Sequence, residues 1–306
     1  MPRIDLALDR PLDVRRTLAV HWRGPGDLTW QVEPGRIWWA TVATGGPAVL
    51  AIAAGREPVR DRLRLEAWGP GADGVLADAP ALLGLGDDPD ALATDHPLVR
   101  ELQRRFVGLR LGRTGRVMEA LVPAITEQKV TGEEARRAYR RLVRAQGEPA
   151  PVPEGGPARL RLPPDPARLA RLPYYAYHSV GLERRRAETI RRVAARAGRL
   201  EQLPEAPLEQ AYAVLTAIPG VGPWTAAEVG IRALGDPDAV SVGDFHLPAM
   251  VCWALAREER GTDARMLELL EPFRGQRGRV IRLLELAGRH APRRGPRMAP
   301  RRIEAI

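Results

Sequence analysis

One stretch of the sequence has residue types that are suited to holding a phosphate. Two helical patterns are separated by residues 218–223, which read Ile-Pro-Gly-Val-Gly-Pro. Glycines adopt backbone angles that other residues resist, and they let another backbone approach closely. Exposed amides at the start of the second helix are suited to an anion. The pattern predicts a helix–hairpin–helix that contacts the DNA backbone, and the alternative is an ordinary Pro-Gly connection between packed helices.

An acidic residue follows this hairpin. Asp244 stands 22 positions after Gly222, in a loop of small residues just before a predicted helix. An aspartate there is most often an N-cap, and the amides of a helix start favour the ionised carboxylate. Held in place, such a carboxylate could stabilise a cationic transition state. His246 is close by, but the five histidines show no metal-ligand spacing, so we interpret it as structural.

The charge of the chain is uneven. The 47 basic residues include a single lysine, Lys129, and the formal net charge is +9. Residues 1–100 carry 11 arginines against 14 acidic residues, so the positive excess belongs entirely to residues 101–306. A basic region of this size indicates a polyanionic partner, most often nucleic acid. Codon usage in a GC-rich genome could explain arginine over lysine, but it does not explain the uneven distribution.

Composition excludes several classes of protein. With 306 residues and 44% hydrophobic residues, the chain can form one large or two medium packed domains. Its single cysteine, Cys252, excludes a disulfide framework, a cysteine-rich zinc site and a four-cysteine iron–sulfur cluster. No apolar run approaches the roughly 18 residues of a membrane span, and Met1–Arg10 lacks the apolar core of a signal peptide. We therefore expect a cytoplasmic bacterial protein without a membrane partner.

The elements that must position these residues change in character along the chain. Short β-branched and aromatic runs between Gly-Pro breaks predict an antiparallel sheet, with strands at Thr17–Trp22, Leu28–Val32, Ile37–Thr44, Ala48–Ala53 and Arg60–Trp68. After His96-Pro97 the pattern is helical. We expect an α+β protein with an N-terminal β-sheet domain at 1–97, a helical region at 98–288 and a basic, mobile tail at 289–306.

The hairpin and the aspartate together resemble a known family. Leu215–Ala226, followed about twenty residues later by Val242-Gly243-Asp244, is similar to the helix–hairpin–helix DNA glycosylase superfamily, and within it to the 3-methyladenine DNA glycosylase II (AlkA-like) family. The stretches 108–130 and 174–187 are similar as well. The resemblance covers about residues 98–288. It implies a mostly helical, two-lobed glycosylase core behind a TBP-like sheet domain.

The resemblance also implies an activity and a set of site residues. Asp244 matches the catalytic aspartate, which stabilises oxocarbenium character as the glycosidic bond breaks. The implied substrate is double-stranded DNA carrying alkylated bases of the 3-methyladenine or 7-methylguanine type, and the damaged base is flipped out before excision. The pocket for that base is expected to contain Trp224, Tyr177, His178 and Gln128. Contacts to DNA are expected from a wedge, Leu111, from Arg110 beside it, and from the hairpin residues Gly220, Gly222 and Thr225.

Each of these residues has a plainer alternative role. The aromatic residues could simply pack in the core, Leu111 could lie in an ordinary surface loop, and Gln128 could join two helices. Glu228 is an unusual charge beside the expected pocket, and it either faces solvent or favours a cationic base.

The position of lysine bears on the type of glycosylase. The lyases of this superfamily use a lysine just after the hairpin, where this chain has Trp224, and Lys129 is far away in sequence. We therefore expect a monofunctional glycosylase without AP-lyase activity. No cofactor is expected to be required, although the resemblance implies a structural Na⁺ or K⁺ at the backbone carbonyls of Thr216, Ile218 and Val221.

Other functions remain open at this point. The chain is expected to act as a monomer in base excision repair at the nucleoid. The alternatives are a damaged-DNA-binding protein without catalysis, a transcriptional DNA binder, and a glycosylase for another lesion such as hypoxanthine or 1-methyladenine.

Overall fold

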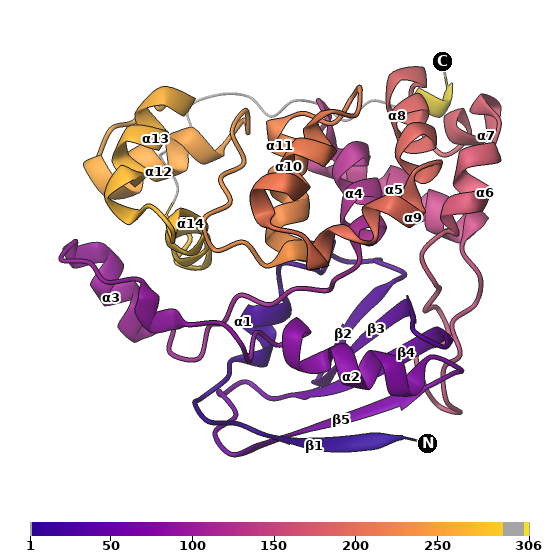
Figure 1. Ribbon diagram of the computed structural model, residues 1–306, viewed down its shortest axis with the longest axis horizontal. Coiled ribbons are helices and arrows are strands. Elements are labelled where there is room, and N and C mark those ends of the chain that lie inside the picture. Colours follow the sequence, from indigo (N-terminus) through magenta and orange to yellow (C-terminus); the bar gives the residue numbers. More distant parts are fainter. Residues whose placement is uncertain (1, 290–302, 306) are drawn as a thin grey trace.

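The N-terminal part of the chain forms a five-stranded antiparallel sheet. The computed structural model describes residues 2–289 and 303–305. The strand order is β1-β5-β4-β3-β2 (Figure 1). The strands are β1 (Arg3–Ala7), β2 (Trp30–Glu33), β3 (Gly35–Ala43), β4 (Gly46–Ala54) and β5 (Arg62–Trp68). The prediction of an α+β protein with an N-terminal antiparallel sheet is confirmed.

Both faces of this sheet are covered. Successive strand residues point to opposite faces, so Trp39 packs with the helices α1 (Val14–Leu18) and α2 (Ala72–Leu82), whereas Trp38 packs on the other side. That other side is closed by Ala150, Leu160 and Leu162, which lie in the proline-rich connection far along the chain. The domain boundary expected after residue 97 would therefore assign the sheet to one domain and the connection that covers its second face to the other.

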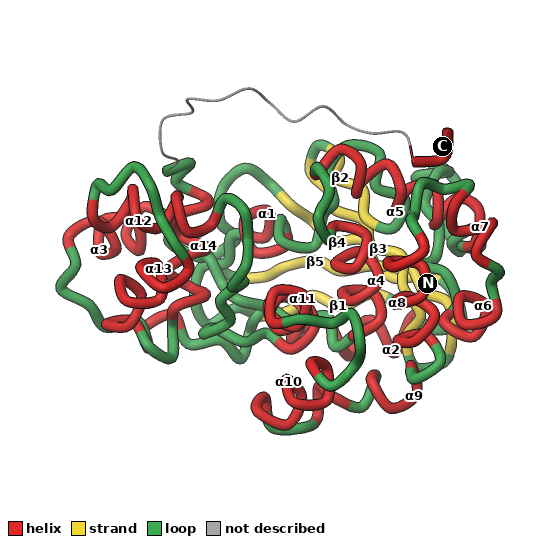
Figure 2. The backbone as a smooth tube through the Cα atoms, turned by 90° about the horizontal axis from the view of Figure 1, so that it is seen from above, coloured by secondary structure: helices red, strands yellow, loops and turns green. Residues whose placement is uncertain are grey.

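The remaining chain is helical and packs around two cores, as Figures 1 and 2 show. One core is built mainly by α4, α5, α8, α10 and α11, and the other by α3 together with α12, α13 and α14. The helix α3 thus joins a group that follows it by some 140 residues. The helices are α3 (Pro97–Arg105), α4 (Val117–Glu127), α5 (Gly132–Gln146), α6 (Pro166–Arg171), α7 (Tyr174–His178), α8 (Arg184–Ala194), α9 (Ala197–Leu200), α10 (Leu208–Thr216), α11 (Pro223–Val229), α12 (Leu247–Ala256), α13 (Asp263–Leu270) and α14 (Arg277–Leu286).

The first predicted strand, Thr17–Trp22, is wrong. The carboxylate of Asp13 accepts the N–H of Arg16 at 2.9 Å and caps the helix α1, which ends at Leu18 before a loop. The true first strand, β1, pairs with β5 at the edge of the sheet. Its only sizeable apolar side chains are Ile4 and Leu6, so its alternation is too short to stand out in the sequence.

The tail predicted at 289–306 lies outside the described residues, apart from 289 and 303–305. Within that last short turn, the Glu304 carboxylate pairs with Arg141 of α5 at 2.6 Å. Of the helices formed by the described residues, none is both long and apolar enough to cross a membrane.

Candidate active site

The hairpin lies between α10 and α11, and its two glycines have different surroundings. Gly220 has φ +99°, and a Cβ there would lie 2.2 Å from the Thr189 hydroxyl of α8, so no larger residue fits. Gly222 has φ −96°, and a Cβ there would meet no atom within 4 Å. The fold itself therefore gives no reason for a glycine at position 222.

The end of α4 is tied to this hairpin. The Gln128 side-chain amide donates to the Gly220 carbonyl at 2.9 Å and to the Thr225 hydroxyl at 2.8 Å. Gln128 thus braces the hairpin, as its alternative role anticipated, and it does not line the cavity described below. The next residue, Lys129, is exposed and has φ +55°, so the lysine that is distant in sequence stands beside the hairpin in space.

Asp244 is held by three neutral donors. One carboxylate oxygen, Oδ1, accepts the backbone N–H groups of His246 at 2.7 Å and Leu247 at 2.9 Å, at the start of α12. The other, Oδ2, accepts the indole N–H of Trp224 at 3.1 Å. Within the described ranges, Asp244 takes part in no ion pair. The orientation of this carboxylate is therefore fixed while its negative charge stays unneutralised.

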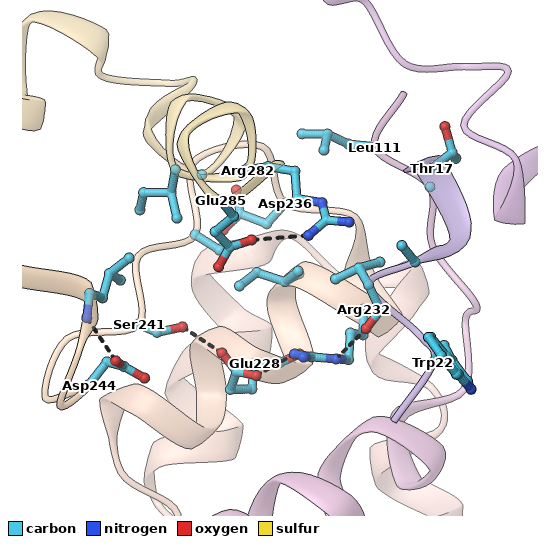
Figure 3. A pocket seen from close by; sticks show the side chains of 18 of the residues that line it. Thr17, Trp22, Leu111, Glu228, Arg232, Asp236, Ser241, Asp244, Arg282 and Glu285 are labelled. Atoms are coloured by element: carbon cyan, nitrogen blue, oxygen red, sulfur yellow. Dashed lines mark hydrogen bonds and ion pairs between the residues drawn. The ribbon is translucent and has the colours of Figure 1, made fainter. Parts of the chain in front are cut away.

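Asp244 lines a cavity of about 430 Å³ that opens between the two helical groups and the N-terminal part (Figure 3). Its walls come from the end of α11 and the turn after it, the loop before α12, α12 and α14, the loop after α1, and residues 110–112. The aromatic, polar and charged residues of the wall include Trp22, Glu228, Arg232, Asp236, Ser241, Asp244, His246, Arg282 and Glu285.

A chain of polar contacts crosses this cavity wall (Figure 3). The Ser241 hydroxyl donates to Glu228 Oε1 at 2.7 Å, and the other Glu228 oxygen forms an ion pair with Arg232. The Arg232 Nε–H then donates to the Val20 carbonyl at 3.1 Å, which joins the helical turn Gly230–Leu234 after α11 to the N-terminal segment. Burial alone would lower the pKa of Arg232, but the negative charges of Glu228, Glu127 and Glu285 together outweigh it and the pKa is raised.

None of the four predicted pocket residues is on the cavity wall, and two of them, Tyr177 and His178, lie on the short helix α7. Tyr177 is fully buried, and its hydroxyl donates to the Leu169 carbonyl at 2.7 Å in the core around α8. His178 lies on the same short helix, α7, and packs against Tyr174. Figures 1 and 2 place α7 at the opposite end of the molecule from α12, so the prediction for both residues is wrong. Their alternative role, packing, is the one observed for Tyr177.

The predicted wedge loop has a mixed outcome. Arg110 is 2% exposed and donates to Asp9 and to the Arg10 carbonyl, so its prediction as a DNA contact is wrong. Leu111 is half-buried on the cavity wall, and its N–H donates to Asp87. Its role as a wedge stays a prediction.

Two hairpin residues are partly engaged within the protein. Trp224 contacts the catalytic candidate through its N–H and is absent from the cavity wall, so its stacking role stays a prediction. The side chain of Thr225 is buried, which leaves its backbone N–H as its only group for a phosphate.

Several wall residues were missed by sequence reasoning. Arg232 follows Glu228 by one helical turn, a spacing typical of ion pairs, and this signal was available. No sequence signal marked the other wall residues Trp22, Ser241 and Arg282, because they come from three segments that meet only in the folded chain.

The fold is similar to that of DNA glycosylases of known structure. A 3-methyladenine DNA glycosylase from Archaeoglobus fulgidus has a TM-score of 0.76 at 22% identity, covering 94% of this chain and 98% of that one. An 8-oxoguanine glycosylase/lyase from Clostridium acetobutylicum in complex with double-stranded DNA has a TM-score of 0.69 at 13% identity, covering 94% and 97%. At such identities the likeness establishes the fold, and the predicted resemblance is confirmed.

The sequence comparison agrees with the fold. The chain is 32% identical over 177 residues to a probable bifunctional transcriptional activator/DNA repair enzyme AlkA of Mycobacterium tuberculosis. This match covers 54% of the chain but only 34% of that relative, so the chain spans about a third of the curated protein it matches. No family model matches the sequence.

Proposed function

We propose that this protein is a DNA N-glycosylase that removes alkylated bases from double-stranded DNA. The observation that carries the proposal is Asp244, an oriented carboxylate on the wall of a cavity beside the hairpin, with no cationic partner among the described residues. Enzymes that act on a base extrude it from the duplex into such a pocket. The likeness to alkylation-repair proteins supports the choice of alkylated bases over other lesions.

The chemistry follows from the charge of Asp244. Cleavage of the glycosidic bond builds positive charge on the sugar, and a nearby carboxylate stabilises it. The three donors to Asp244 are neutral, so they orient the carboxylate without cancelling its charge. An N-alkylated purine such as 3-methyladenine or 7-methylguanine is already cationic and leaves without a strong general acid. The proposed enzyme therefore depends on one carboxylate, with a water molecule as the nucleophile.

The hairpin supplies the proposed grip on the DNA backbone. The open space at Gly222 suits the close approach of a phosphate, because a side chain there would point into it. Basic side chains lie close to the turn: Arg192 donates to the Pro219 carbonyl at 3.5 Å, and the exposed Lys129 follows Gln128, which is bonded to Gly220. We expect Gly222→Val to weaken duplex binding about tenfold or more while leaving the thermal midpoint of unfolding unchanged.

A lysine-dependent lyase step is not part of the proposal. Trp224 occupies the position of the lyase lysine and is bonded to Asp244, and Lys129 is not on the cavity wall. Borohydride should therefore trap no covalent complex with abasic DNA. A complex that disappears in Lys129→Arg would show instead that this lysine reaches the sugar.

The proposed monovalent cation fits the hairpin. The Ile218 carbonyl accepts the Val221 N–H at 2.9 Å and keeps one lone pair for an ion. With the carbonyls of Thr216 and Val221, it would hold Na⁺ or K⁺ and draw a phosphate toward the turn. Duplex binding should then be weaker in a tetramethylammonium buffer than in K⁺ at equal ionic strength.

The experiment that tests the function is base release. Duplex DNA methylated with a radioactive methyl donor is incubated with the wild-type protein, and the free bases are separated by chromatography. We expect release of methylated purines by the wild type and a severe loss in Asp244→Asn. Asp165→Asn is the matched control, because Asp165 caps α6 through two backbone amides in the same way and is not on the cavity wall. Absence of release by the wild type would contradict the proposal.

A further inference from the structure

A second carboxylate faces the same cavity and has no part in the reaction described above. Glu228 is 9% exposed, lies on α11 and is held on both oxygens, by the Ser241 hydroxyl at 2.7 Å and by Arg232. An ionised carboxylate has about four lone-pair sites. One site on each oxygen therefore stays available to a ligand in the cavity.

Its place in the cavity suits a group that reads the base. The Asp244 backbone N–H donates to the Ser241 carbonyl at 3.2 Å, and the hydroxyl of Ser241 in turn holds Glu228. In Figure 3, Glu228 follows Asp244 and Ser241 along the wall, away from the catalytic candidate. A base whose sugar lies at Asp244 therefore directs its far edge toward Glu228. Enzymes of this kind read a flipped base by hydrogen bonds to its Watson–Crick edge.

The acceptor pattern of a carboxylate selects among alkylated purines. Two adjacent acceptors match two adjacent N–H donors, and the guanine edge offers this pair through its N1–H and 2-amino groups. The adenine edge offers a single amino group beside a ring nitrogen that is itself an acceptor or carries the alkyl group. We propose, as an extension of the proposed glycosylase function, that Glu228 is a specificity-determining residue that accepts both donors of an alkylated guanine.

Arg232 has a positioning role in this arrangement. It neutralises the charge of Glu228 and anchors it to the Val20 carbonyl, so the carboxylate discriminates by its hydrogen bonds more than by its charge. Two cationic substrates whose Watson–Crick edges carry different donors should therefore be treated differently. 7-Methylguanine and 3-methyladenine form such a pair, and methylated duplex DNA releases both in one reaction.

The test is the ratio of the two released bases at pH 6.5. In Glu228→Gln, we expect the rate of 7-methylguanine release to fall about tenfold to a hundredfold, and that of 3-methyladenine to change less than about threefold. Affinity for abasic duplex DNA, which lacks the base, should stay the same. The double variant Glu228→Gln/Arg232→Gln removes both charges together. It should show the same change in the ratio of released bases, and it replaces the single variant if that variant folds poorly.

A matched control is present in the same cavity. Glu285 also lines the wall and pairs with an arginine, Arg282, at 3.1 Å, so Glu285→Gln should leave the ratio unchanged. An unchanged ratio in both Glu228 variants, whether or not the two rates fall together, would overturn the inference while base release by the wild type still upholds the proposed function. If the wild type releases neither base, the proposed function fails and the inference fails with it.

Discussion

Two carboxylates on one cavity wall are held in opposite ways. Asp244, in the loop before α12, accepts hydrogen bonds from two backbone amides and an indole and has no ion-pair partner among the described residues. Glu228, on α11, is paired with Arg232 and bonded to the Ser241 hydroxyl. The first keeps its charge available to a developing cation, whereas the second has its charge neutralised and its direction fixed. The same functional group can thus serve electrostatic catalysis in one setting and recognition in the other.

This difference has a consequence for stability. A buried ion pair that loses one partner leaves an uncompensated charge, whereas a carboxylate held by neutral donors can be removed at the expense of its hydrogen bonds alone. Replacing the partner of Glu228 should therefore destabilise the fold more than replacing Asp244.

The largest effect on stability is expected from Arg232→Ala. This change leaves Glu228 unpaired near the base of the cavity and removes the bond to Val20, so the free energy of unfolding should fall by about 3–5 kcal/mol. Urea denaturation followed by circular dichroism measures it. Combining the change with Glu228→Gln should recover part of the loss, and no recovery would show that the two charges are not coupled.

A third carboxylate combines neutral donors with burial. Glu119 accepts hydrogen bonds from Thr41 and Trp39, and burial raises its pKa to about 7 from the usual 4.5. Between these two values the folded state holds a proton that the unfolded state has lost, so stability falls as the pH rises from 4.5 to about 7 and levels off above it. Relative to Glu119→Gln, the wild type should lose at most about 3 kcal/mol of unfolding free energy between pH 4.5 and 8.

His21 makes a contribution to stability that depends on pH in the opposite direction. Burial lowers the pKa of His21 to about 3, so its neutral form favours folding above pH 6.5 and this contribution is lost as the pH falls. His21 is present in both the wild type and Glu119→Gln, so the difference between them isolates Glu119. A difference that does not vary with pH would contradict the buried, protonated glutamate.

The smallest effect on stability is expected from Asp244→Ala. The change removes the cap of α12 but strands no charge, so the free energy of unfolding should fall by about 1 kcal/mol. A decrease in unfolding free energy as large as that in Arg232→Ala would contradict the inferred difference between Asp244 and Glu228. Thermal or urea unfolding at pH 7 provides the comparison.

The part of the site that is local in sequence could be predicted, and the part built by distant segments could not. The hairpin turn and the capping aspartate depend on neighbouring residues, so their glycines, proline and helix start are visible in the chain. The wall around Glu228 joins residues 20, 232 and 241, and nothing in the sequence sets their spacing. Tyr177 shows the reverse error, because it was predicted to line the pocket and lies in the core.

In the fold, too, local features could be predicted from the sequence and tertiary features could not. The helical pattern predicted after His96-Pro97 agrees with the structure, in which α3 begins at Pro97. The run Thr17–Trp22 had strand-like residues, but the cap at Asp13 and the packing of Leu18 under the sheet made its start helical. The edge strand β1 was missed because its pairing with β5 is a tertiary property.

The measurement that tests the account most directly is the single-turnover rate of base release by Asp244→Asn. Asparagine keeps the shape and can still accept the hydrogen bonds of the helix start, so folding and affinity for abasic duplex DNA should match the wild type. The rate of methylated-purine release should fall at least about a hundredfold, because the charge that stabilises the sugar cation is gone. A rate within threefold of the wild type, at equal DNA affinity, would contradict the assignment of Asp244 as the catalytic group.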